Sequence, residues 1–364
     1  MKNDEKAEKE RGFMLDNYKK GLFLSNPNLK YKKIIVNNNY SNGFNDIFEI
    51  FSSFENKETY IASPNKYEYL LDIISIKTYK PFITLKGHKN YIYKVKYFIN
   101  DKNNNEYLIS VDKDNVIIIW DITNKYSNIY KIDNNISKGH ISDVLLIFNI
   151  CDSKKIIDDY IIISYNTKIF TSVYSLNKKC KIKTIEKTNE YNTYYLIEWF
   201  NRKDSNNYII ELSDGNIFIY NIKDNTLYTE LTSGYFDYSQ NNCGYIYNNN
   251  NNDFLVVSSP CGNINIWDLD IKDLYCNISL YDNCDNKKLY ISYILQWSSK
   301  YMIVCEYVNK GFKIIDIDTL KIITSVNGVH SGGIICAKKF HHPIYGESLL
   351  SLGQDNNMIL WSVV

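Results

Sequence analysis

The stretch LKGHKNYIYKVKYFINDKNNNEYLISVDKDNVIIIWDI, residues 85–122, decides the fold of this 364-residue chain. It opens near Gly87-His88, continues through two segments in which apolar residues alternate, and closes on Trp120-Asp121. Alternation with a period of two predicts short β-strands that bury one face. The stretch is therefore interpreted as one unit of several strands, and the rest of the chain can be searched for copies of it.

The position of Trp120 recurs along the whole chain. Its equivalents are separated by 46, 54, 46, 47, 48 and 46 residues, and short β-rich runs flank each of them. The seven anchors are Ile74, Trp120, Tyr174, Tyr220, Trp267, Ile315 and Trp361. A period of about 45 residues with four strands per repeat is typical of propeller blades. We therefore predict an all-β fold, a seven-bladed β-propeller of four-stranded antiparallel blades.

The two ends of the repeat array complement each other. The chain stops three residues after Trp361, so the last blade has no fourth strand, whereas Tyr31–Val36 is a strand without a blade. We predict that this N-terminal strand completes the last blade and closes the ring, because it would pair an otherwise bare edge. Residues 1–20 are charged and lack a strand pattern, which predicts a flexible N-terminal tail; residues 21–364 form the propeller domain.

Composition excludes several classes of function. The formal net charge is +1, which argues against a nucleic-acid ligand held by a global basic field. The N-terminus has no apolar signal-peptide region, no apolar run approaches about 18 residues, and the eight cysteines form no CxxC pair. We expect a cytoplasmic or nuclear protein with no membrane partner and no cofactor. The Asn248–Asn252 run is predicted to be a surface loop insertion.

The motifs resemble those of one repeat family. The best matches are Gly87-His88 with Asp114 and Trp120-Asp121, then Trp267-Asp268, and Asp355 with Trp361. On these residues the chain, from about Tyr31 to Val364, resembles the WD-repeat β-propellers, although tyrosine replaces tryptophan at two anchors. The resemblance implies a structural hydrogen-bonded set in the second blade and structural roles at the other matches. The expected structural residues are His88, Ser110, Asp114, Trp120, Trp267, Asp355 and Trp361.

Two sharper interpretations compete with these structural roles. His88, Ser110 and Asp114 have the residue types of a catalytic triad, but the same positions recur in other blades, which favours structure over catalysis. His341-His342 could bind a metal ion, but neighbouring residues on a strand point to opposite faces. We therefore expect no enzyme and no metal site.

The family resemblance also implies a rigid platform for protein complexes. Its binding face is expected at the turns between the second and third strands and at the connections between blades. In this chain those positions are Tyr91, Lys113, Asp143, Ser213, Pro260, Val308 and Gln354. They are chemically mixed, which suits a protein or peptide better than a phosphate-rich ligand. We expect a protein-interaction scaffold in an intracellular multiprotein complex, with no small-molecule substrate. The alternative is a reader of a short modified peptide or of ubiquitin through the channel face.

Overall fold

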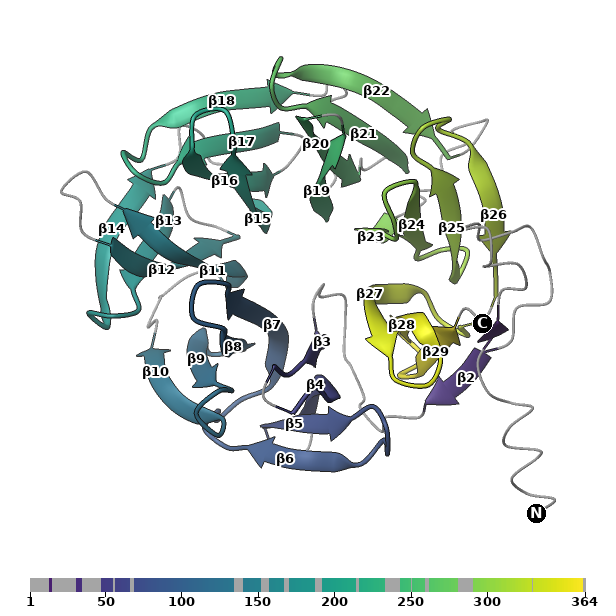
Figure 1. The fold of residues 1–364 in the computed structure, drawn as a ribbon, viewed down its shortest axis with the longest axis horizontal. Coiled ribbons are helices and arrows are strands. Elements are labelled where there is room, and N and C mark those ends of the chain that lie inside the picture. The colour runs from purple at the N-terminus through teal and green to yellow at the C-terminus, as the bar shows by residue number, and fades with distance from the viewer. Residues whose placement is uncertain are drawn as a thin grey trace. The chain divides into compact units, whose positions relative to one another are not determined.

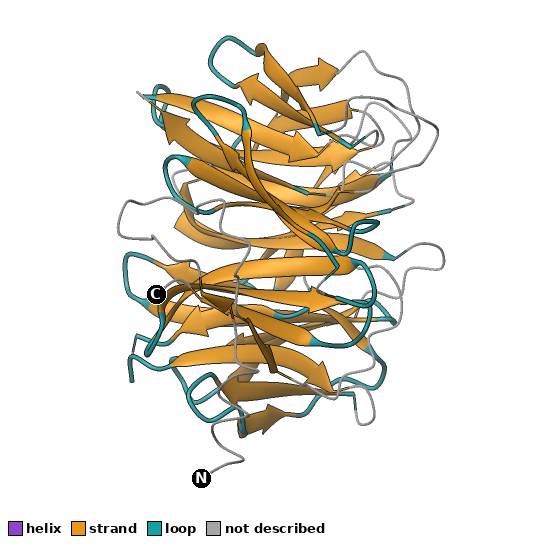
Figure 2. Ribbon diagram, turned by 90° about the vertical axis from the view of Figure 1, so that its right-hand side faces the viewer, coloured by secondary structure: helices purple, strands orange, loops and turns teal. Residues whose placement is uncertain are grey.

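The structure is a computed structural model in which every regular element of the described residues is a β-strand (Figures 1 and 2). The described residues are 13–14, 31–34, 47–54, 56–65, 69–133, 140–151, 157–166, 170–186, 192–213, 216–232, 243–249, 251–258, 262–280, 291–328 and 330–362.

Six sheets contain four consecutive strands each, here called a to d in chain order. Blades 1 and 2 contain β3 (Glu49–Ser52), β4 (Thr59–Asn65), β5 (Leu70–Ser75), β6 (Pro81–Leu85), β7 (Ile92–Asn100), β8 (Asn105–Asp112), β9 (Val116–Asp121) and β10 (Ser127–Asp133). Blades 3 and 4 contain β11 (Ile141–Cys151), β12 (Ile157–Tyr165), β13 (Phe170–Ser175), β14 (Cys180–Glu186), β15 (Thr193–Asn201), β16 (Asn206–Ser213), β17 (Asn216–Asn221) and β18 (Leu227–Thr232). Blades 5 and 6 contain β19 (Gly244–Asn249), β20 (Asn252–Ser258), β21 (Asn263–Asp268), β22 (Asp273–Ser279), β23 (Ile291–Gln296), β24 (Tyr301–Glu306), β25 (Gly311–Asp316) and β26 (Ile322–Val326).

The seventh sheet takes strands from both parts of the chain. It contains β27 (Ile334–His342), β28 (Gly346–Gly353) and β29 (Met358–Ser362), and β2 (Tyr31–Ile34) pairs antiparallel with β29. This is the pairing expected of the spare N-terminal strand, and the closure of the ring through it stays a prediction. Within the expected tail, β1 (Phe13–Met14) pairs parallel with β29, and the rest of that tail lies outside the described residues.

These seven consecutive sheets confirm the predicted fold class, an all-β seven-bladed propeller. The chain divides into two compact units. Unit 1 contains residues 1–97, 122–126 and 290–364, and with them blades 1, 6 and 7; unit 2 contains residues 98–121 and 127–289, and with them blades 3 to 5. The strands of blade 2 are shared between the two units.

Burial explains why the repeats are recognisable in the sequence. The b and c strands of blade 6, β24 and β25, are buried along their whole length, whereas the outer strand β22 of blade 5 alternates between exposed and covered residues. Inner strands are therefore mostly apolar. The core lies between blades: one cluster joins Ile162 and Val173 of blade 3 to Ile209 and Phe218 of blade 4. Such burial of apolar surface is the main stabilising contribution to folding.

The aspartate that follows an anchor residue closes the c–d turn. Asp268 Oδ1 accepts hydrogen bonds from the backbone N–H groups of Asp270 (2.9 Å) and Ile271 (3.2 Å). Asp316 Oδ1 does the same in blade 6, at 3.0 Å and 2.9 Å. Short aspartate side chains favour such turns because they satisfy backbone donors locally. This turn geometry explains why an aspartate follows the anchor residue in these two blades.

The asparagine run of blade 5 is not the loop insertion that its composition predicts. Asn249 pairs with Asn252 across the β19–β20 hairpin, which leaves a two-residue connection. Asn251 adopts a φ of 68°, a left-handed conformation that asparagine tolerates well, and Asn248 Nδ2 donates to the backbone carbonyl of Asn252 at 3.2 Å. The asparagines therefore form the tight turn itself, and their side chains support it.

Candidate functional site

Each blade has two ends. The a–b end carries the a–b and c–d turns, and the b–c end carries the b–c turn and the connections between blades. Most of the site residues expected from the sequence belong to the b–c end. In blade 7 of unit 1 a hydrogen-bonded network holds this end.

Blade 7 contains a complete four-residue network. The Trp361 indole Nε1–H donates to Ser351 Oγ at 2.8 Å, and Ser351 Oγ lies 2.9 Å from His330 Nε2. His330 Nδ1 lies 3.0 Å from Asp355 Oδ1. A carboxylate only accepts, so the network assigns the imidazole proton to Nδ1 and leaves Nε2 to accept from the serine hydroxyl. The chain of bonds connects the d–a connection, β28, the b–c turn and β29.

Asp355 accepts hydrogen bonds through both of its carboxylate oxygens. Its Oδ1 also accepts from the backbone N–H of Asn357 at 3.1 Å, and its Oδ2 accepts from the backbone N–H of Ser331 at 2.9 Å. Burial raises the pKa of Asp355, but the hydrogen bonds from Asn357, His330 and Ser331 outweigh it and lower that pKa to about 2. A Cβ at Gly353 would lie 2.2 Å from His330 Nδ1, so only glycine leaves room for the pair.

Blade 2 shows part of the same arrangement. The Trp120 indole Nε1–H donates to Ser110 Oγ at 2.9 Å, and His88 is buried. Asp114 is exposed at the b–c turn, and its place in the network stays a prediction. The buried carboxylate of this turn belongs to Asp112, whose Oδ1 accepts from the backbone N–H groups two and four residues further on, at 3.0 Å each.

Blade 5 keeps the tryptophan and lacks its acceptor. In blades 2 and 7 the serine stands ten residues before the anchor, but the residue ten before Trp267 is Val257. Trp267 is only 3% exposed, and its indole Nε1 has no hydrogen-bond partner among the described residues. Its structural role is therefore packing in the cluster between blades 4 and 5.

Two network members, His330 and Ser351, were not among the structural residues expected from the sequence. Valine precedes His330, so a search for Gly-His does not find it. Spacing would have found both residues. The intervals from His330 to its serine, aspartate and tryptophan are 21, 25 and 31 residues, and those from His88 are 22, 26 and 32.

The blade 7 network has the connectivity of a Ser-His-Asp triad but not its chemistry. Ser351 is fully buried and His330 is 1% exposed, so no substrate carbonyl can reach the hydroxyl oxygen. The Trp361 indole also donates to that oxygen, which lowers its nucleophilicity. The arrangement therefore stabilises the blade, as each such hydrogen bond contributes about 1 kcal/mol net.

Four of the expected binding residues present exposed side chains. Tyr91 is 38% exposed and packs edge-on against Tyr69, with ring centroids 5.0 Å apart. Lys113 is exposed in the b–c turn of blade 2. Val308 is 44% exposed, and Gln354 is also exposed. Pro260 lies outside the described residues.

The structure brings Val308 and Gln354 together. The Gln354 Nε2–H donates to the hydroxyl of Tyr307, the residue next to Val308, and so links the b–c turns of blades 6 and 7. The connection between these blades packs closely against the Tyr307 ring, since a Cβ at Gly333 would lie 2.6 Å from Tyr307 Cδ2. The backbone N–H of Gln354 donates to the carbonyl of Gly333 at 2.8 Å. The result is a rigid surface with one exposed apolar side chain and one amide.

Two expected surface residues are buried instead. Asp143 is fully buried; its Oδ2 accepts from the backbone N–H of Leu196 at 2.7 Å and its Oδ1 from that of Val144 at 2.8 Å. The carboxylate therefore joins blade 3 to blade 4 and does not face a partner. Ser213, the last residue of β16, is also fully buried. For both residues, the position in the repeat did not predict whether the side chain is exposed.

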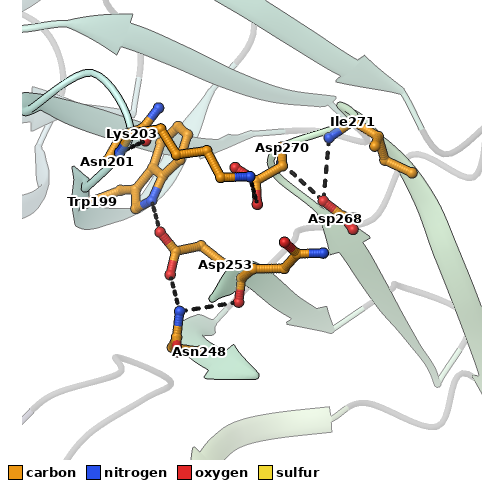
Figure 3. Close-up of polar contacts among 9 residues, drawn as sticks. Trp199, Asn201, Lys203, Asn248, Asp253, Asp268, Asp270 and Ile271 are labelled. Carbon is orange, nitrogen blue, oxygen red and sulfur yellow. Dashed lines mark hydrogen bonds and ion pairs between the residues drawn. The ribbon is translucent and has the colours of Figure 1, made fainter. Parts of the chain in front are cut away.

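Blades 4 and 5 are joined by a polar cluster rich in carboxylates (Figure 3). Asp253 accepts from the Trp199 indole at 2.9 Å and from the Asn248 amide at 3.0 Å. Lys203 forms an ion pair with Asp270 at 2.8 Å, and this bond raises the pKa of the lysine. Each of these carboxylates therefore has a donor or a cation from the neighbouring turns. The cluster serves as a structural link between two blades.

No metal centre is found among the described residues, which contain no group of three or more His, Cys, Asp or Glu side chains able to hold an ion. The two adjacent histidines of β27 differ sharply: His341 has a 70% exposed side chain, whereas His342 is 1% exposed. His342 Nδ1 accepts from the backbone N–H groups of Ile344 and Tyr345 at 3.1 Å and 3.3 Å, so it closes the a–b turn. The described part of the chain contains no helix long and apolar enough to cross a membrane.

Comparison with known proteins identifies the fold. No protein-family model matches the sequence, and no curated protein matches it. Among solved structures 1252 chains match, one of them the crystal structure of BBS1N in complex with ARL6DN, soaked with lead. That structure matches with a TM-score of 0.65 at 10% sequence identity, over 90% of this chain and 94% of the other. The likeness is one of fold, and it agrees with the seven blades described above.

Proposed function

We propose that this protein is a non-enzymatic interaction scaffold of the WD-repeat type, acting in a multiprotein complex of the cytoplasm or nucleus. The observation that carries the proposal is the rigid b–c end of blades 6 and 7. There Val308 and Gln354 are exposed on two turns that the Tyr307 hydrogen bond joins and that the Asp355 network supports. A preorganised surface loses little conformational entropy on binding, which favours a protein partner.

The fold comparison supports a protein partner in general terms. The similar propeller was solved in complex with another protein, ARL6DN. By analogy, this chain would bind a partner protein. Exposed valine and glutamine offer apolar contact and directional hydrogen bonding, without the concentrated charge that a phosphate-rich ligand requires.

A second candidate function, a reader of a short modified peptide or of ubiquitin, is favoured by one observation. The aromatic pair of Tyr69 and Tyr91 is half-exposed at the b–c end of blades 1 and 2. Aromatic faces hold alkylated or apolar side chains of a peptide well. In this case Tyr91→Ala abolishes binding of the partner, whereas Val308→Asp leaves it unchanged.

The test is affinity purification of the tagged full-length chain from its own cells, followed by quantitative mass spectrometry. Three chains are compared: wild type, Val308→Asp, and the control Ile271→Asp, which changes a 67% exposed residue at an a–b end. The scaffold proposal predicts a reproducible, stoichiometric set of proteins that wild type and control retain and Val308→Asp loses. A wild-type chain that purifies alone, or a set that Val308→Asp retains in full, contradicts it.

A further inference from the structure

We propose that the a–b end of unit 1 is a peripheral binding surface for an anionic lipid bilayer. Four large apolar side chains are exposed there: Phe54 and Phe82 at 56% each, Ile322 at 40% and Ile344 at 71%. Phe54 and Ile344 lie in a–b turns, and Phe82 and Ile322 lie at the starts of d strands. Side chains of this kind at turn tips can enter the boundary between headgroups and acyl chains.

Contacts between blades make these turns one surface. The Tyr79 hydroxyl lies 3.5 Å from His342 Nε2, which joins the c–d turn of blade 1 to the a–b turn of blade 7. The Phe82 ring lies 6.3 Å from the ring of Tyr126 in the c–d turn of blade 2. Lys339 Nζ donates to the carbonyl of Trp297 at 2.6 Å and joins blade 7 to the a–b turn of blade 6. The apolar tips are therefore carried by turns that contact one another.

The same turns carry an excess of positive charge. Among the described residues, the a–b and c–d turns of unit 1 contain six lysines and two acids. The lysines, all exposed, are Lys57, Lys77, Lys80, Lys125, Lys300 and Lys321. The acids are Glu58 and Asp318. Of the lysines, Lys300 lies 3.6 Å from Asp316, whose side chain is only 7% exposed, so the positive charge of Lys300 is partly balanced. Lysines near an anionic membrane surface each favour binding by about 1 kcal/mol, or about fivefold in affinity.

The choice of side chains favours a bilayer over a protein surface. Protein interfaces are enriched in arginine, tyrosine and tryptophan and are depleted in lysine. These turns contain no arginine, and their cations are all lysine, a compact charge suited to a mobile layer of headgroups. Exposed phenylalanine and isoleucine side chains complement the apolar side of the same boundary. This surface is separate from the b–c end that carries the proposed scaffold function, and it replaces the expectation of no membrane partner.

The test is co-sedimentation of the full-length protein with two kinds of vesicle, phosphatidylcholine alone and an equal mixture of phosphatidylcholine and phosphatidylserine. Wild type is expected to bind the mixed vesicles, to bind neutral vesicles far more weakly, and to dissociate as salt is raised. Lys77→Glu with Lys80→Glu is expected to lower affinity for the mixed vesicles at least about 25-fold, about fivefold for each lysine. Ile344→Ser is expected to lower it about tenfold.

Matched controls carry the same substitutions at the other end of the blades. Val308→Ser removes a 44% exposed apolar side chain, and Lys89→Glu reverses an exposed charge. Both are expected to bind the mixed vesicles as wild type does. The proposal is overturned if wild type does not distinguish the two vesicles, if the a–b variants bind as wild type, or if both controls lose binding equally. A surface made for an acidic protein would attract the anionic vesicles through charge alone, so Ile344→Ser would bind them as wild type does.

Discussion

Ser351 is the residue on which the blade 7 network depends, because two buried groups share its hydroxyl. Ser351→Ala leaves the Trp361 indole N–H and His330 Nε2 without this partner. Each buried group left unpaired costs about 1–3 kcal/mol, so we expect the free energy of unfolding to fall by at least that amount. Urea unfolding of the variant and the wild type measures it.

A matched tryptophan pair separates the hydrogen bond from packing. Trp361→Phe and Trp267→Phe remove the same ring volume, but only the Trp361 indole has an acceptor among the described residues. We expect Trp361→Phe to cost about 1 kcal/mol more than Trp267→Phe in the same unfolding measurement. Equal losses would show that the indole hydrogen bond contributes nothing to the blade.

Asp355 makes stability depend on pH at the acid end. The pKa of its carboxyl group is about 2 in the folded chain and 3.8 without the fold, so the folded state favours the charged form. The stability that this pKa difference gives the folded state is complete above about pH 4 and is lost as the pH falls towards 2. We expect the stability difference between wild type and Asp355→Asn to shrink over that range in urea titrations. A constant difference would contradict the role given to the carboxylate.

At the scale of elements, β24 and β25 contain a buried ion pair. Lys313 Nζ lies 2.5 Å from Glu306 Oε1, and both side chains are nearly inaccessible. Glu306→Leu leaves a buried lysine without this partner, and such losses cost about 3–5 kcal/mol. The double variant Glu306→Leu with Lys313→Met replaces the pair by apolar groups and is expected to recover most of that stability. Chemical unfolding of the single and double variants checks this; a double variant no more stable than the single one would contradict it.

Element positions were largely predictable from the sequence, since inner strands are buried on both faces and are therefore mostly apolar. All seven anchors named from the sequence lie in the c strand of a blade. The asparagine run of blade 5 was misread because composition alone does not distinguish a long loop from a tight turn. Register decides between them, and register depends on tertiary pairing.

For the whole molecule, β2 pairs with β29, and closure of the ring through this strand is the prediction to test. Deleting residues 1–36 removes β2, leaves the edge of β29 bare, and is expected to lower the unfolding temperature and broaden the transition. Deleting only residues 1–12 keeps β1 and β2 and serves as the control. Calorimetry that gives the same transition for both deletions and for wild type would contradict closure by this strand.

Site residues were less predictable than the fold. The turn positions of Val308 and Gln354 follow from the repeat, and both are exposed as expected. Asp143 occupies a similar position but faces a neighbouring blade, because a backbone N–H of β15 needs an acceptor there. The repeat pattern specifies where a residue lies in its own blade. It does not specify what the adjacent blade places against it.

The most direct test of the scaffold account is hydrogen–deuterium exchange on the complex purified from its own cells, compared with the free chain. The account predicts slower exchange in the complex at the b–c turns of blades 6 and 7, residues 307–310 and 354–357. Unchanged exchange at both turns in a complex whose other segments are protected would contradict it.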